Sequence, residues 1–161
     1  MSCYELEDVV LSENLTEISD HLFCRCDELV EVKIPEGITA IGDSSFSGCY
    51  NLTVVLPRGI TNIGASAFSN CTSLVDFEIP YGVKALGDYV FYGCENITDI
   101  IIPNTVEVIG NDAFSSCTSL ESVDLPESVR SIYNRAFKDC SALKSVEISG
   151  EVDISDEAFW G

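Results

Sequence analysis

The chain has 161 residues, 46% of them hydrophobic, and carries 27 acidic against 8 basic residues, a formal net charge of −19. This length suits one domain, and this apolar content excludes a disordered chain. A strongly acidic surface repels nucleic acid phosphates and anionic membranes, so we expect neither as a partner. Basic proteins remain compatible partners, although the acidic residues can equally serve only to solvate the surface.

Apolar residues do not gather into long runs. No stretch approaches the roughly 20 residues of a membrane span, and no charged segment followed by an apolar one opens the chain. We therefore expect no membrane insertion and no signal peptide in this chain.

Phenylalanine recurs every 22 or 23 residues from one end of the chain to the other. A cysteine follows three residues after each of the first six, and Cys3 fits the same register one step earlier. A fixed period of this size is typical of a solenoid or a propeller. The two columns of residues, here called the phenylalanine and cysteine ladders, are Phe23, Phe46, Phe68, Phe91, Phe114, Phe137 and Phe159, and Cys3, Cys26, Cys49, Cys71, Cys94, Cys117 and Cys140.

Each repeat contains the same elements in the same order, F-x-x-C-x-x-L-x-x-V-x-I-P-x-x-V-x-x-I-G-x-x-A. The alternation in V-x-I predicts a short half-buried strand that ends at proline. The glycine after the later isoleucine, as at Gly42, predicts either positive φ or close backbone approach. The Ala-Phe-x-x-Cys segment predicts a tight turn or a turn of 3₁₀ helix.

Stacking these units predicts a β-rich solenoid, since one unit cannot bury its apolar face alone. We expect one parallel sheet with one strand per repeat, and turn or 3₁₀ segments on the other face. About seven repeats fill residues 1–161 as a single domain. The last repeat departs from the pattern, which leaves open a cap, with Trp160 over the final unit, or simple truncation. A weakly capped end would allow end-to-end self-association.

The pattern I-G-x-x-A-F-x-x-C-x-x-L-x-x-V-x-I-P resembles the BspA-type leucine-rich repeat, in a subtype marked by cysteine and phenylalanine ladders. The resemblance extends from about Cys3 to Phe159. It implies surface-exposed or secreted proteins of bacteria and some protists that adhere to host proteins or other cells. A cell-surface location follows from it, whereas free thiols and the lack of a signal peptide keep a cytoplasmic location open.

The ladder cysteines are interpreted as small buried hydrophobic residues. Stacked side chains point the same way, which is poor geometry for a disulfide, and a linear column offers no four converging zinc ligands. Cys24 lies off the ladder beside Arg25 and should face outward if Cys26 faces inward. It is either a reactive thiol or an incidental exposed one.

Catalytic motifs are missing from the sequence. The only histidine, His21, falls in a turn, and no zinc-protease, nucleophile-elbow, phosphate-binding or calcium-loop pattern occurs. We therefore expect no enzymatic activity, no metal and no cofactor. Four Asn-x-Ser/Thr sequences leave glycosylation open.

The outward side chains of the strands are the candidate binding surface, because repeat proteins bind through the long surface that stacking creates. Near the centre an acidic patch surrounds one apolar side chain, with a tyrosine at its rim, and tyrosine is enriched at interfaces. These candidate residues are Asp76, Glu78, Asp99, Ile101, Asp124 and Tyr81. The alternative interpretation is that these outward residues simply vary from repeat to repeat and bind no partner.

The predicted function is protein–protein interaction without catalysis, adhesin-like through the family resemblance. An intracellular scaffold and a structural spacer array of a larger surface protein remain as alternatives. The sequence does not identify the partner.

Overall fold

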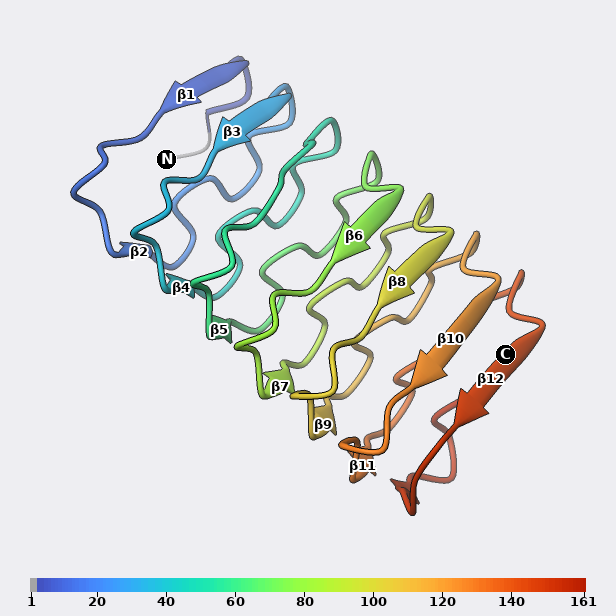
Figure 1. Cartoon of the computed structure of the whole chain (residues 1–161). Helices are drawn as coiled ribbons and strands as arrows, with labels where there is room; N and C mark the ends of the chain where they lie inside the picture. Colours follow the sequence, from blue (N-terminus) through green and yellow to red (C-terminus); the bar gives the residue numbers. More distant parts are fainter. Residues whose placement is uncertain (1–2) are drawn as a thin grey trace.

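The computed structural model describes residues 3–161, which wind into a coil with one repeat per turn (Figure 1). The first and last of the described residues lie at opposite ends of this coil. No helix occurs among residues 3–161. The expected leucine-rich-repeat solenoid with parallel strands is confirmed, and each turn of the coil is called a rung below.

One row of strands comes from the V-x-I segments. Exposed and buried residues alternate along them, as in β6 and β8, and proline follows in most rungs. The strands pair in parallel as β1–β3, β6–β8 and β10–β12. They are β1 (Asp8–Val10), β3 (Glu31–Lys33), β6 (Asp76–Glu78), β8 (Asp99–Ile101), β10 (Ser122–Leu125) and β12 (Ser145–Ile148).

A second row of two-residue strands runs along another side of the coil (Figure 1), so most rungs contribute two strands where we expected one. Such strands are too short to show the alternation by which a strand is recognised in sequence. They pair as β2–β4–β5 and β7–β9–β11–β13. Their bounds are β2 (Glu17–Ile18), β4 (Ala40–Ile41), β5 (Asn62–Ile63), β7 (Ala85–Leu86), β9 (Val108–Ile109), β11 (Ser131–Ile132) and β13 (Asp153–Ile154).

The segment around each ladder phenylalanine is a tight turn, one of the two forms expected. Its backbone N–H groups alternate in direction: those of Ser44, Phe46 and Gly48 donate to carbonyls of the next rung, and those between them donate within the rung. This alternation accompanies left-handed backbone two residues before and after phenylalanine, with φ of 51° at Ser44 and 76° at Gly48. Within the described residues, ten non-glycine residues adopt positive φ in such positions.

The glycine after the later isoleucine of the repeat lets the backbone approach the preceding rung closely, as Gly42 shows. Gly42 lacks positive φ, and a Cβ added there would lie 2.5 Å from the Oδ1 atom and 2.6 Å from the backbone nitrogen of Asp20. The Asp20 carboxylate accepts a hydrogen bond from the Asp43 N–H at 2.8 Å. A side chain at Gly42 would therefore collide with the preceding rung.

The phenylalanine ladder forms the axis of a single apolar core. Successive rings stack with centroids 5.2–5.8 Å apart. Phe46, Phe68, Phe91 and Phe114 are fully buried, whereas Phe159 is 40% exposed. Trp160, the suggested cover of the final rung, is 60% exposed, and its ring centroid lies 5.2 Å from the Lys138 ammonium.

The cysteine ladder makes directed hydrogen bonds that the sequence did not reveal. From Cys49 to Cys140, each thiol donates to the carbonyl of the phenylalanine in the preceding rung, at 3.0–3.2 Å. Burial raises the pKa of Cys49, Cys94 and Cys140 to about 12. Each thiol is thus a protonated donor to a buried carbonyl.

The expectation of buried ladder thiols is wrong for Cys3, which is exposed because no rung among the described residues precedes it. Cys26 is buried and Cys24 is partly exposed, which agrees with the expectation that the Cys24 side chain faces outward if Cys26 faces inward. The eight cysteines, all within residues 3–161, are free thiols.

Candidate protein-binding surface

The outward residues of the first strand row form two columns on one face of the coil. Strand pairing aligns Asp76 with Asp99 and Glu78 with Ile101, as the repeat register indicated. All six candidate residues have exposed side chains. Strand pairing therefore places residues that are 23 positions apart in the sequence next to each other on this face.

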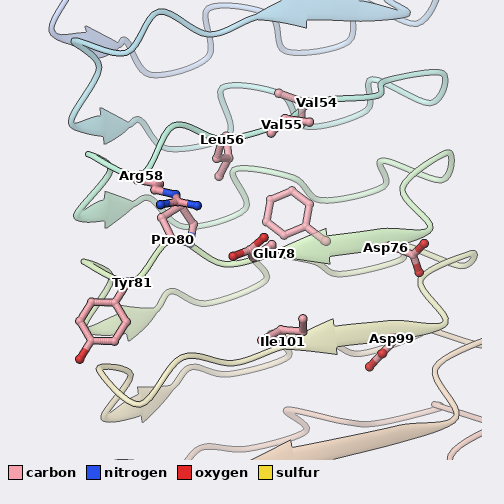
Figure 2. Close-up of a pocket in the computed structure, with 11 residues that line it drawn as sticks. Val54, Val55, Leu56, Arg58, Asp76, Glu78, Pro80, Tyr81, Asp99 and Ile101 are labelled. Carbon is pink, nitrogen blue, oxygen red and sulfur yellow. The ribbon is translucent and has the colours of Figure 1, made fainter.

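A groove of about 940 Å³ opens on this face beside β6 (Figure 2). Five of the six candidate residues line it, and only Asp124 lies outside. The groove also contains residues that we had not nominated, from the third rung and from the strand core. Its lining is Val54, Val55, Leu56, Arg58, Asp76, Phe77, Glu78, Pro80, Tyr81, Asp99 and Ile101.

The groove lies beside a rung that is one residue short. Four residues separate Leu52 from Pro57, where five separate the equivalent Leu29 from Pro35. The missing residue corresponds to Val30, since Thr53 forms a bridge with Glu31. The 22-residue step from Phe46 to Phe68 marks the shortened rung in the sequence, but the same step recurs from Phe137 to Phe159 and does not by itself indicate a groove.

Strand pairing stops at this junction. Among residues 3–161, β6 pairs only with β8 and β7 only with β9, so neither strand row joins the third rung to the fourth. At every other junction at least one row is paired. The junction is held instead by turn hydrogen bonds, such as the Phe68 N–H to the Val90 carbonyl at 3.0 Å.

The base of the groove is rigid. Phe77 is buried, and its ring lies 5.1 Å from Phe68 and 4.9 Å from Phe91, centroid to centroid. Tilted and edge-on contacts of this kind are favourable for aromatic rings. A ligand would therefore meet a preformed surface, which lowers the entropic cost of binding.

Three carboxylates and one guanidinium border the groove. Within residues 3–161, Asp76, Glu78 and Asp99 take part in none of the ion pairs, which involve other residues. Arg58 is likewise outside these pairs and lies at the opposite end of the groove from Asp76 and Asp99 (Figure 2). The charges are thus available to a partner.

No group of three or more His, Cys, Asp or Glu side chains within residues 3–161 is arranged to hold a metal ion. Nor does that range contain a helix with the length and apolar character to cross a membrane.

Repeat pattern, coil and stacked ladders together define a leucine-rich-repeat protein. The chain belongs to the BspA type leucine rich repeat region family, whose model matches residues 1–83 and 53–161 with six copies. None of the curated proteins compared with the chain matches it.

Solved bacterial structures share the fold. The leucine rich repeat protein of T. pallidum is 32% identical with a TM-score of 0.86, covering 91% of this chain and 72% of that one. A leucine-rich repeat protein of Bacteroides ovatus is 22% identical with a TM-score of 0.63, covering 97% and 56%. One from Eubacterium ventriosum is 25% identical with a TM-score of 0.67, covering 82% and 42%. The chain therefore spans about half the length of the latter two.

Proposed function

We propose that this chain is a protein-binding module that attaches to host or matrix proteins through its outward strand face, as an adhesin does. The groove beside β6 carries the proposal, because it combines a rigid apolar base with carboxylates that are unpaired within the described residues. Membership in a repeat family supports a binding role, since repeat stacking creates extended binding surfaces. Residues 1–161 act as one solenoid domain, and no catalytic residue is assigned.

The family resemblance also supports a cell-surface or secreted location. An intracellular scaffold is the second candidate, and the accessible thiols of Cys3 and Cys24 favour it. Exposed thiols are prone to intermolecular disulfides in oxidising compartments and persist in reducing ones. Locating the protein in fractionated cells with an antibody separates these two functions.

A binding assay on immobilised matrix proteins and intact host cells, at two salt concentrations, tests the adhesin proposal. The test variant combines Asp76→Lys, Asp99→Lys and Ile101→Ser on the strand face. Its control makes the same reversal of two charges on the second strand row, with Glu17→Lys and Asp153→Lys. We expect saturable binding that the test variant loses and the control keeps. Absence of binding, or equal binding by both variants, would contradict the proposal.

A further inference from the structure

We propose that the groove beside β6 takes an extended segment of a partner protein in which a lysine or arginine lies next to a bulky apolar residue. This inference rests on the proposed protein-binding function and specifies what the groove recognises. Three features of the groove carry it: its shape, its apolar patch and the order of its charges.

The shape favours an extended occupant. The groove runs along β6, at the single junction where neither strand row is paired within residues 3–161. Extended peptides dock along interrupted or exposed sheet edges, with alternate side chains directed into pockets. The unpaired edge of β6, beside the shortened third rung, provides such a place.

The apolar patch favours a bulky side chain. Val55, Tyr81 and Ile101 are 87%, 66% and 62% exposed, and all three line the groove. Large apolar side chains that are exposed together around a hollow mark an interaction site. Beneath them Phe77 is fixed by its aromatic neighbours, so the patch accepts a side chain without rearrangement.

The order of charges favours a cation and fixes its position. Asp76 and Asp99 lie side by side at one end of the groove, and Glu78 lies between them and Arg58 (Figure 2). A lysine or arginine of the partner fits at the Asp76–Asp99 end, where two carboxylates are adjacent. Arg58 repels a cation at the other end, so the partner segment binds in one orientation.

Selection of a random nine-residue peptide library displayed on phage, against the full chain, tests this inference. We expect the enriched peptides to carry a lysine or arginine within two residues of a bulky apolar residue. Synthetic copies should bind the Asp99→Lys variant at least tenfold more weakly and the Asp8→Lys variant within twofold of wild type. Asp8 lies in the same outward column, on β1 and away from the groove, so that variant controls for net charge.

A second variant tests shape independently of charge. A valine inserted between Leu52 and Thr53 restores the missing residue and replaces no surface side chain. We expect it to weaken the same peptides at least tenfold while circular dichroism and melting show an intact coil. If the insertion does not fold, Val55→Asn replaces it, because that side chain is 87% exposed and this substitution leaves both the core and the net charge unchanged.

Failure of this inference is distinguishable from failure of the proposed function. No enriched peptides, enriched peptides without a basic residue, or equal binding by wild type and the insertion variant would overturn the groove proposal. Matrix or cell binding that the insertion variant keeps but the triple strand-face variant loses would leave the adhesin function standing without the groove.

Discussion

The buried thiols of the cysteine ladder should make the protein unfold in mild alkali. Cys49, Cys71, Cys94, Cys117 and Cys140 are buried, and burial raises the pKa of each above its ordinary value of 9.0. Because the folded pKa is raised, this stabilisation is complete below pH 9. It is lost as the pH rises from 9 towards 12, since only the unfolded chain releases the protons.

The magnitude follows from proton linkage. A thiol that titrates only in the unfolded state reduces the free energy of unfolding by about 1.4 kcal/mol per pH unit. Five such thiols together reduce it by about 7 kcal/mol per pH unit. Domains are typically stable by about 5–15 kcal/mol, so the transition should fall within about one to two pH units above 9.

Urea unfolding followed by circular dichroism between pH 8 and 10.5, with a reductant present, measures this slope. The double variant Cys94→Ala/Cys117→Ala retains three of the five thiols, so its slope should fall to about 4 kcal/mol per pH unit. A wild-type slope below about 2 kcal/mol per pH unit at pH 10, or equal slopes in both proteins, would refute the reasoning.

Three further predictions concern the core, a glycine and a thiol. Phe91→Ala should lower the free energy of unfolding, measured in urea, by about 3–5 kcal/mol. Phe159→Ala should lower it by less than half as much, because the Phe159 ring is 40% exposed. Similar losses in the two variants would contradict the stacking of the phenylalanine ladder. Gly42→Ala places a Cβ 2.5 Å from an atom of the preceding rung and should lower the free energy of unfolding by about 1–3 kcal/mol. In the control Gly37→Ala the nearest contact is at 3.5 Å, so the melting temperature should not fall. Equal melting temperatures of the two variants would contradict the close approach of the rungs at Gly42. Iodoacetamide at pH 8 should label Cys24 in the folded protein, and the buried ladder thiols only in urea, by mass spectrometry; early labelling of Cys94 would contradict its burial.

The coil and its columns could be predicted because each rung repeats the same spacing. Equal steps between phenylalanines align equivalent residues, so the pairing of Asp76 with Asp99 follows from counting. A continuous core needs only that apolar residues recur at the same positions. The outward direction of Glu78 and Ile101 likewise follows from alternation along a strand.

The groove could not be predicted in this way, because it depends on where the repeat fails. A step of 22 residues and one of 23 both preserve the ladder, and only the place of the missing residue, between Leu52 and Thr53, adjoins the junction where neither strand row is paired. Arg58 and Val55 then line a hollow that no pairwise spacing indicates. The thiol hydrogen bonds were missed for a related reason, since they depend on the distance between rungs.

The alternating N–H directions of the turns have a consequence for synthesis of the chain. The N–H groups of Ser44, Phe46 and Gly48 find their acceptors at Ala65, Ala67 and Ser69, in the following rung. A turn therefore stays incomplete until the next 22 or 23 residues have left the ribosome, about one to five seconds at ordinary rates of translation. Folding along the nascent chain would then lag synthesis by one rung, each new repeat completing the turn before it.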